Sequence, residues 1–295
     1  MNDIVGAIVA RNGGADLAAA AGDLIAAFGA AGVLVVDNAS TDGALPPAGV
    51  TIRRLPENRG FAAGANAALA WAKERGATGL LLLNQDARID LAGVRRLTEL
   101  FGADPTLGAA FAKVVRLDQP YVLAGLAGRR NFRHKLTSGL GGGAIDCGAP
   151  ATPLAVPHGH GAALLLRVEA ARAVGGFDEF LFAYHEEVDL CWRLARAHYG
   201  IWLEPRAVVR HRGPGGDPAR RAAKAYFLGR NSLLVARKNG GAGAWLRVAG
   251  WAVAAALLYY GPRALAGDAE ARGLLAGWRD GWLRREASPA VRSTL

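Results

Sequence analysis

The chain contains little cysteine, and the cysteines it has do not form a metal-binding pattern. Only Cys147 and Cys191 occur in 295 residues, and no Cys-x-x-Cys pair is present. A structural zinc site is therefore not expected. Two widely separated thiols are typical of reduced cysteines in a cytosolic protein, and a single disulfide between them is the alternative.

Long apolar runs are lacking as well. The first residues carry no basic start, and the apolar run that begins at Ile4 ends before Arg11, so no secretory signal is expected. The longest later run, residues 248–261, is shorter than the roughly 20 residues that cross a bilayer. Hydrophobic residues nevertheless make up 52% of the chain, which is enough for a sizeable core.

Acidic residues are fewer than basic residues. The 35 Lys and Arg residues outnumber the 25 Asp and Glu residues and give a net charge of +10. This excess favours anionic partners, which include nucleic acid, acidic lipid headgroups and phosphorylated substrates. Composition does not choose among these three classes.

The first hundred residues alternate between short apolar runs and helical patterns. Apolar runs that predict buried strands occupy residues 4–10, 32–36, 50–54 and 79–83. Between them lie helical patterns at 15–28 and 62–75, and a further helix, capped by Asp90, ends near Phe101. The alternation predicts an α/β fold with a doubly wound, mostly parallel sheet.

The pattern is less regular after this point. Residues 124–153 are rich in Gly and Arg without a period, which predicts a mobile loop. A strand is expected at 162–166 and a helix at 188–197, and two short strands are expected at 201–203 and 207–209.

From Pro218 onward the chain is predicted to be helical. We therefore expect one domain over residues 1–218 and a helical extension over 219–295. The extension contains a basic segment, an apolar stretch flanked by Trp and Tyr, and an Arg-rich last helix. These features suit a membrane interface, while packing on the first domain or on a second subunit is an equally weighted alternative. The basic segment fits either solvent, anionic lipid or a lipid-linked diphosphate.

Three polar residues follow predicted strands. Asp37, Asp86 and His211 each come directly after a strand, and ligands of open parallel sheets bind beyond the carboxyl ends of the strands. Each residue alone could cap a turn or lie on the surface, but their joint placement indicates a site. Oxygen and nitrogen ligands together with a diphosphate suit Mg²⁺ or Mn²⁺, and the imidazole favours Mn²⁺ slightly.

The acidic residues are densest at the start of the helix expected near residue 188. Glu186, Glu187 and Asp189 occur within four positions, and Arg193 follows Asp189 at i,i+4 spacing. Stabilisation of the helix dipole and an Asp189–Arg193 pair explain part of this cluster. They do not explain two adjacent glutamates, whose mutual repulsion raises a pKa and favours a general base.

Six segments follow one another along the chain: Asp37–Gly43, Asn58–Asn66, Leu83–Asp86, Gly175–Asp178, Glu186–Leu190 and Pro205–His211. Together and in this order they resemble glycosyltransferase family 2, and in particular its rhamnosyltransferase-like bacterial members. The resemblance covers roughly residues 4–238.

The resemblance implies a GT-A fold, a nucleoside-diphosphate sugar donor, a divalent cation (Mg²⁺ or Mn²⁺) and direct displacement with inversion. Asp86 and His211 match the metal-binding positions of the family, although Asn84 replaces the first acid of its metal motif. Glu187 falls where the family has its catalytic Asp, with Glu186 as the rival base and Asp189 as a further catalytic candidate.

The resemblance also implies a donor site and an acceptor side. The acceptor or phosphate side would include Arg193 and Arg230. Asp37 would bind the base, and the complete set expected on the donor side is Asn12, Asp37, Asn38, Asn58, Gly60, Gly64, Asn66, Asn84 and Asp86.

The partners follow from the same resemblance. The expected donor is a UDP- or dTDP-sugar, with rhamnose as one candidate sugar, and the expected acceptor is a glycan or a polyprenyl-diphosphate-linked glycan. The process would be cell-envelope polysaccharide synthesis at the cytoplasmic face of the cell membrane, where the chain would be peripheral. A second copy of the chain is a further candidate partner, and no nucleic acid is expected.

Two rival functions stay open at this stage. A sugar nucleotidyltransferase needs a Gly-rich phosphate loop with a basic residue after the first strand, and residues 11–14 (Arg-Asn-Gly-Gly) resemble one only faintly. A non-catalytic basic protein that binds membranes would leave Asp86, Glu187 and His211 unexplained. A dehydrogenase is less favoured, because no Gly-x-Gly-x-x-Gly follows Ala10.

Overall fold

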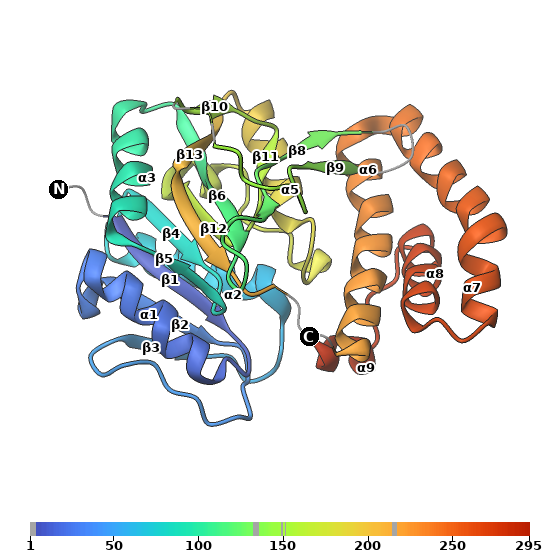
Figure 1. Ribbon diagram of the computed structural model, residues 1–295, viewed down its shortest axis with the longest axis horizontal. Coiled ribbons are helices and arrows are strands. Elements are labelled where there is room, and N and C mark those ends of the chain that lie inside the picture. The colour runs from blue at the N-terminus through green and yellow to red at the C-terminus, as the bar shows by residue number, and fades with distance from the viewer. Residues whose placement is uncertain (1–3, 132–135, 149, 151, 214–216) are drawn as a thin grey trace.

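A mostly parallel sheet lies between two layers of helices, and further helices stand beside it (Figure 1). The computed structural model describes residues 4–131, 136–148, 150, 152–213 and 217–295. The main strands are β1 (Ile4–Ala10), β2 (Val33–Asp37), β3 (Thr51–Arg54), β4 (Gly79–Leu83), β6 (Leu107–Arg116), β12 (Ala163–Arg167) and β13 (Gly200–His211).

The strand order is β10-β13-β6-β12-β4-β1-β2-β3, where β10 is Leu154–Ala155. β12 pairs antiparallel with both β4 and β6, whereas β3, β2, β1, β4, β6 and β13 all run in the same direction. The prediction of a mostly parallel sheet is therefore confirmed. The carboxyl ends of these six strands meet at one edge of the sheet, and β12 begins at that edge.

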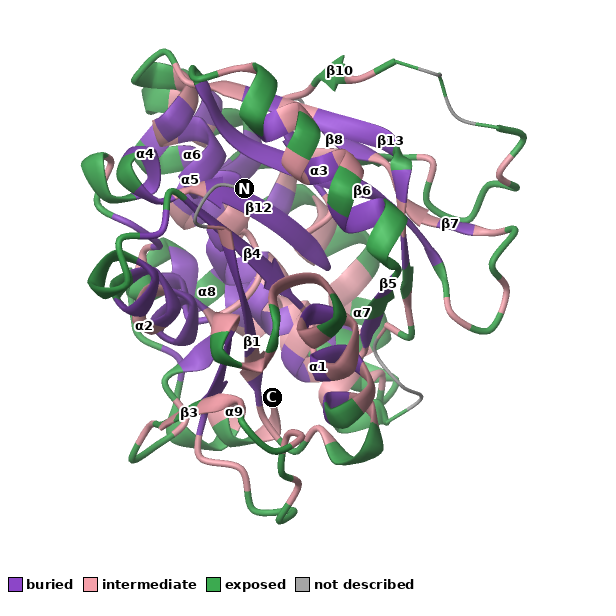
Figure 2. Cartoon of the chain, turned by 90° about the vertical axis from the view of Figure 1, so that its left-hand side faces the viewer, coloured by how far each residue is buried: buried purple, intermediate pink, exposed green. Residues whose placement is uncertain are grey.

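The helices cover both faces of the sheet. α1 (Gly14–Phe28) and α3 (Leu91–Ala103) pack on one face, and α2 (Gly60–Glu74), α4 (Val168–Ala173) and α5 (Glu186–Arg196) pack on the other. The central strands β1, β2, β4, β6 and β12 are almost entirely buried (Figure 2), which explains their continuous apolar runs. Two short 3₁₀ turns, η1 (Ala30–Gly32) and η2 (Glu179–Leu181), complete this part. The Asp90 cap is confirmed, since its Oδ1 accepts a hydrogen bond of 2.7 Å from the Gly93 amide.

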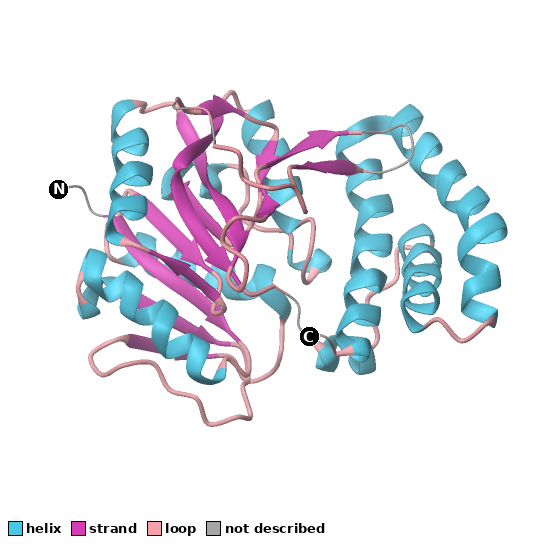
Figure 3. Cartoon of the chain, in the orientation of Figure 1, coloured by secondary structure: helices cyan, strands magenta, loops and turns pink. Residues whose placement is uncertain are grey.

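The prediction of a loop over residues 124–153 is wrong in part. This region contains β7 (Leu123–Gly125), β8 (Ala127–Arg130) and β9 (Thr137–Leu140), and the last two extend away from the main sheet in Figure 3. β8 also pairs with β11 (His158–Gly159). Strands held by backbone hydrogen bonds need no apolar alternation, so Gly-rich segments conceal them. Residues 132–135, 149 and 151 lie outside the described residues.

Two other differences concern strands. The strands expected at 201–203 and 207–209 are one strand, β13, whose register against β6 shifts between Glu204 and Val208 around Pro205. A proline cannot donate a ladder hydrogen bond, so the bulge accommodates it. β5 (Ala87–Ile89) pairs with the end of β13 and so joins the segment after β4 to His211.

The C-terminal part is helical, as expected. It consists of α6 (Pro218–Ala255), a π-helical turn η3 (Ala256–Tyr260), α7 (Gly261–Leu265), α8 (Ala269–Trp282) and α9 (Pro289–Thr294). α6 bends at Gly241, which has φ 73°. α8 packs closely on α6 because three glycines of α8 face α6. A Cβ on one of them, Gly277, would lie 2.1 Å from the Tyr226 carbonyl oxygen.

The second half of α6 and the segment after it expose apolar side chains. Leu257 and Leu258 are 72% and 82% exposed, and Leu246, Val253 and Leu265 are exposed as well. Among the described residues, the stretch Pro218–Leu265 is long and apolar enough, by length and composition, to cross a membrane. Only 22% of its most apolar window is buried inside the protein.

Candidate active site

A cleft of about 980 Å³ opens at the carboxyl edge of the sheet. It is bounded by the segments that follow β1, β2, β4, β6 and β13, by the turn before β12, and by the first turns of α6. The predicted site residues that line it are Asn38, Asn58, Gly60, Asn84, Asp86, Glu186, Glu187 and His211.

Asp86 and His211, here called the metal pair, are in direct contact. His211 Nε2 donates a hydrogen bond of 3.1 Å to Asp86 Oδ1, and the Asn84 amide nitrogen lies 3.4 Å from the same ring nitrogen. Burial raises the pKa of Asp86, but the hydrogen bond and charge of His211, together with Arg212, lower the pKa more, so the net shift is downward. The carboxylate is therefore ionised at neutral pH.

The metal pair fits a shared cation. Two donor atoms that bind one Mg²⁺ or Mn²⁺ side by side at about 2.1 Å lie about 3 Å apart, close to the separation found here. Among the described residues, no group of three or more His, Cys, Asp or Glu side chains is arranged to hold a metal. A cation at Asp86 and His211 would thus take its other ligands from a bound substrate and from water.

His160 lies next to the metal pair and was not predicted. Its ring centroid is 5.4 Å from that of His211, and its Nδ1 accepts a hydrogen bond of 3.2 Å from the Ala162 amide. Burial, followed by the charges of His211 and Lys224, lowers the pKa of His160 to about 4, so the ring is neutral with its proton on Nε2. Only the antiparallel direction of β12 brings this residue to the carboxyl edge, and the sequence does not reveal that direction.

Glu186 and Glu187, the acidic pair, begin α5 at the same cleft. Burial and the charge of Glu187 raise the pKa of Glu186 well above its usual range, and Glu186 Oε2 has no hydrogen-bond partner among the described residues. Burial raises the pKa of Glu187 to about 6. At neutral pH Glu187 is thus mostly ionised, and the raised pKa of Glu186 favours its neutral form. The Glu187 carboxyl carbon is also close to Gly161, where a Cβ would lie 3.9 Å from it.

The loop before α5 is strained and is held by one side chain. Phe182, Tyr184 and His185 all have positive φ values, between 66° and 68°. The Asn231 amide on α6, which is fully buried, donates to the carbonyl oxygens of Leu181, Ala183 and Tyr184 at 2.9, 2.8 and 2.7 Å. This clamp, which sequence reasoning missed, fixes the backbone that presents the acidic pair.

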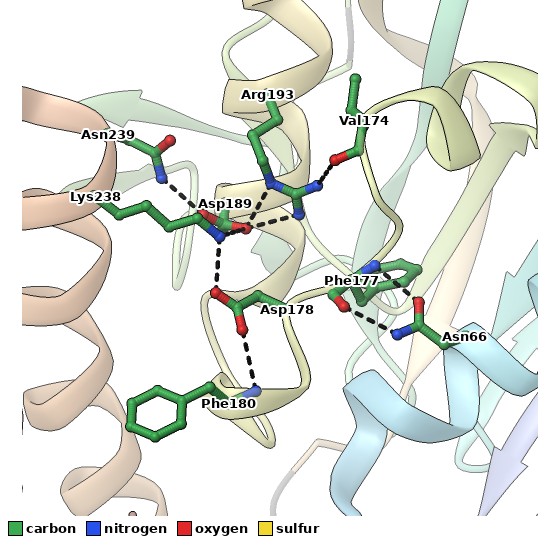
Figure 4. A network of polar contacts seen from close by, with 9 residues as sticks. All are labelled: Asn66, Val174, Phe177, Asp178, Phe180, Asp189, Arg193, Lys238 and Asn239. Carbon is green, nitrogen blue, oxygen red and sulfur yellow. Dashed lines mark hydrogen bonds and ion pairs between the residues drawn. The ribbon is translucent and has the colours of Figure 1, made fainter. Parts of the chain in front are cut away.

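Asp189 lies away from the cleft. It is fully buried and accepts hydrogen bonds from Arg193 (2.7 and 2.9 Å), Lys238 (3.0 Å) and Asn239 (2.7 Å), as Figure 4 shows. The predicted Asp189–Arg193 pair is confirmed. Lys238 also binds Asp178 at 2.7 Å, so this network joins α5 to α6.

Two other predicted residues have structural contacts outside the cleft. Arg230 is buried between α6 and the segment after α8, where it donates to the Arg285 carbonyl oxygen at 2.9 Å and to Asn231 Oδ1 at 2.8 Å. Asn66 on α2 binds both the amide and the carbonyl of Phe177 (Figure 4). The structure therefore brings neither residue to the acidic pair.

The opposite end of the cleft is formed by amide side chains. Asn38 Nδ2 donates to Asn58 Oδ1 at 2.8 Å, and Asn38 Oδ1 accepts from the Arg59 amide at 2.9 Å. Gly60, with φ 79°, comes so close to the loop before α5 that a Cβ would lie 2.4 Å from the Phe182 carbonyl oxygen. This end offers the hydrogen-bonding groups of amide side chains.

Asn12, Asp37 and Gly64 lie beside that end of the cleft and do not line it. Asp37 Oδ1 accepts from the Ser40 amide at 2.8 Å, and Asn12 Oδ1 accepts from the Thr41 amide at 2.8 Å, so both shape the turn after β2. Gly64 lets α2 approach β1, because a Cβ there would lie 2.4 Å from Val9 Cγ1.

Gln85 is a further residue that sequence reasoning missed. Its Oε1 accepts from the Arg11 amide at 2.7 Å, and its Nε2 donates to the Arg11 carbonyl at 3.0 Å. Gln85 thereby ties the loop after β4 to the loop after β1. Arg11, which also lines the cleft, donates to the carbonyl oxygens of Asn38 and Ala39 at 3.2 and 3.1 Å and so holds the turn after β2.

Comparisons with known proteins support the fold. The chain resembles the mannosyltransferase PcManGT from Pyrobaculum calidifontis, solved with GDP-Man and Mn²⁺, at a TM-score of 0.58 and 18% identity over 96% of this chain and 88% of that one. It also resembles GalNAc-T7, solved with UDP, GalNAc and Mn²⁺, at a TM-score of 0.58 and 13% identity over 79% of this chain and 47% of that one. The chain has the GT-A fold.

Sequence relatives match over short segments only. A 46-residue segment is 50% identical to the succinoglycan biosynthesis protein ExoA of Rhizobium meliloti, and it covers 16% of this chain and 13% of that protein. A 72-residue segment is 42% identical to the pre-mycofactocin glycosyltransferase of Mycobacterium tuberculosis, over 23% of this chain and 15% of that protein. No family model matches the chain.

Proposed function

We propose that this chain is an inverting glycosyltransferase of the family 2 type, which transfers a sugar from a nucleoside-diphosphate donor to a hydroxyl group. The observation that carries the proposal is the presence of the metal pair and the acidic pair in one cleft at the carboxyl edge of a GT-A fold. A metal-binding pair beside a carboxylate with a raised pKa is the arrangement that a single displacement at an anomeric carbon requires.

Each end of the cleft has its own role in this reaction. Asn38, Asn58 and Gly60 hold the nucleoside, and Asp37 and Asn12 shape the turn that presents Asn38. Asp86 and His211 would hold the Mg²⁺ or Mn²⁺, which neutralises the donor diphosphate when bound. The solved neighbours were both crystallised with Mn²⁺ and a nucleotide or nucleotide sugar, which supports this assignment by analogy.

Glu187 acts as the general base. It accepts the proton of the acceptor hydroxyl, whose oxygen forms the new bond to the anomeric carbon as the bond to the diphosphate breaks. A pKa of about 6 keeps Glu187 ionised at neutral pH and still basic enough to accept a proton. Glu186 is buried beside it with a pKa raised well above the usual range, which favours its neutral form and keeps the charge of the acidic pair low.

The acceptor and the cellular setting belong to the same proposal. The donor is a UDP- or dTDP-sugar, with rhamnose as one candidate, and the acceptor is a glycan or a polyprenyl-diphosphate-linked glycan of the cell envelope. The exposed leucines of residues 246–265, which stand near Arg247, Tyr259 and Arg263, support attachment to the inner face of the membrane. The named relative in succinoglycan biosynthesis agrees with a role in polysaccharide synthesis.

A panel of nucleotide sugars tests the proposal. Thermal unfolding is measured with UDP-, dTDP- and GDP-sugars, with and without Mn²⁺; a donor at about 100 times its Kd adds about 2.7 kcal/mol to the free energy of unfolding. The products of the stabilising donor are then analysed. Release of nucleoside diphosphate supports a glycosyltransferase, release of pyrophosphate would identify a nucleotidyltransferase, and stabilisation by no donor would refute the proposal.

A further inference from the structure

The cationic side chains around the cleft differ in whether they already have partners. Of the Lys and Arg residues that line its described part, Arg116 pairs with Asp118 at 3.1 Å and Arg212 pairs with Asp16 at 2.8 Å. Arg11 donates to backbone carbonyls. Arg220 and Lys224 remain, and neither forms an ion pair with a described carboxylate.

Arg220 and Lys224 lie one helical turn apart at the start of α6, so their side chains leave the same face of the helix. Both line the cleft. Lys224 Nζ lies 5.8 Å from the centre of the Tyr184 ring, two residues before the acidic pair. Asp86 and His211 line the same cleft as these two cations.

The other cations of α6 point elsewhere. Arg221 forms an ion pair of 2.7 Å with Glu270 on α8, and Arg230 is buried against Phe180. Arg237 lies over the Trp245 ring. The basic segment therefore does not present one uniform charged face. It directs two cations into the cleft, where burial lowers the pKa of Lys224 and the charge of Glu270 offsets this effect only in part.

We propose that Arg220 and Lys224 bind the diphosphate of the donor and stabilise it as it leaves. This assignment rests on the proposed function. When the bond between the anomeric carbon and the β-phosphate oxygen breaks, its electron pair stays on that oxygen, while the proton of the acceptor hydroxyl goes to Glu187. Because Asn84 offers an amide in place of a carboxylate, the metal pair supplies a single anionic ligand. Arg220 and Lys224 supply positive charge where negative charge develops.

Calorimetric binding of nucleotides tests the assignment. The probes are UDP and dTDP and the corresponding monophosphates, each with Mn²⁺, and the proteins are the parent chain, R220M, K224M and the control R221M. A lost charge-assisted hydrogen bond corresponds to about tenfold or more in Kd. We expect R220M and K224M to bind the diphosphate about tenfold more weakly and to bind the monophosphate as the parent does, while R221M matches the parent for both.

The possible outcomes separate the assignment from the proposed function. If the parent chain binds neither diphosphate, the proposed function fails. If the parent binds a diphosphate and both variants bind it equally well, the assignment is wrong. An unchanged diphosphate Kd combined with a raised KM for a lipid-diphosphate acceptor would also overturn it, because the two cations would then serve the acceptor. R220K, which keeps the charge, should restore most of the affinity that R220M loses.

Discussion

Replacing Asn231 with alanine should impair catalysis through the loop that carries the acidic pair. The Asn231 side chain does not line the cleft, but its buried amide group donates to three carbonyl oxygens of residues 181–184. That loop contains three non-glycine residues with positive φ. Without the clamp, the backbone can relax toward ordinary dihedral angles, and Glu187 then moves relative to the metal pair.

The structure sets the size of the effect. An amide group has two N–H bonds, so its removal leaves about two buried carbonyls without a full donor, at about 1–3 kcal/mol each. Relaxation of the strained residues returns about 1 kcal/mol or more, which leaves a loss of about 3 kcal/mol in the free energy of unfolding. A displacement of about 1 Å in a reacting group costs about a hundredfold in rate. We therefore expect kcat to fall about a hundredfold, with the donor KM nearly unchanged because Asn38 and Asn58 lie on other loops.

The pH profile separates this effect from general loss of stability. In the parent chain, kcat should rise with pH through about 6, since Glu187 must be ionised to act as base and burial raises its pKa to about 6. In Asn231→Ala the loop opens to water. The pH at which kcat reaches half of its maximum should then fall from about 6 toward 4.5, the pKa of a free glutamate. Val248→Ala, a buried position in the second half of α6, is the matched destabilised control and should keep the parent profile. If Asn231→Ala has a normal kcat and the same pH dependence of kcat as the parent, Asn231 matters only for folding.

Four further variants test the remaining assignments. Glu187→Gln should lower kcat by about a hundred- to ten-thousandfold, and Glu186→Gln by less; the reverse order would move the base by one residue. Because the pKa of Glu187 is higher in the folded state, its ionisation lowers the free energy of unfolding as the pH rises from 4.5 through about 6. Glu187→Gln removes this effect, so above pH 6 the variant should be more stable than the parent by at most about 2 kcal/mol in chemical denaturation. Asp86→Ala should abolish transfer and a chelator should mimic it, whereas full activity in excess chelator would exclude the metal. Leu257→Asp with Leu258→Asp should release the chain from anionic vesicles in a sedimentation assay without changing its Tm, and continued pelleting would locate the membrane contact elsewhere.

Sequence reasoning succeeded where a local pattern carries the information. Asp86 follows a fully buried strand, and the parallel arrangement of such strands brings it to the same edge as the residue that ends β13. The Asp90 cap and the Asp189–Arg193 pair depend on spacings of three and four residues along one helix. Such contacts can be predicted from the sequence because both partners belong to the same local element.

The features that sequence reasoning missed depend on pairing between distant segments. β8 and β9 are held by backbone hydrogen bonds, which leave no apolar pattern in a Gly-rich segment. His160 lies at the site only because β12 is antiparallel to the two strands beside it. Asn231 contacts a loop about 50 residues earlier in the chain, and a lone asparagine in a helical pattern gives no sign of its partners. These contacts require the tertiary arrangement before they can be recognised.

The helices after Pro218 and the acidic pair depend on each other through Asp189. A fully buried carboxylate is tolerated only when it is paired, and Arg193 on its own helix supplies just part of the pairing. Lys238 and Asn239 on α6 supply the rest. α5 can therefore hold Asp189 in its buried position only when α6 is docked, and Glu187 lies two residues earlier on the same helix. Docking of α6 therefore helps to position the proposed base, even though Asp189 lies about 50 residues before Lys238 and Asn239 in the chain.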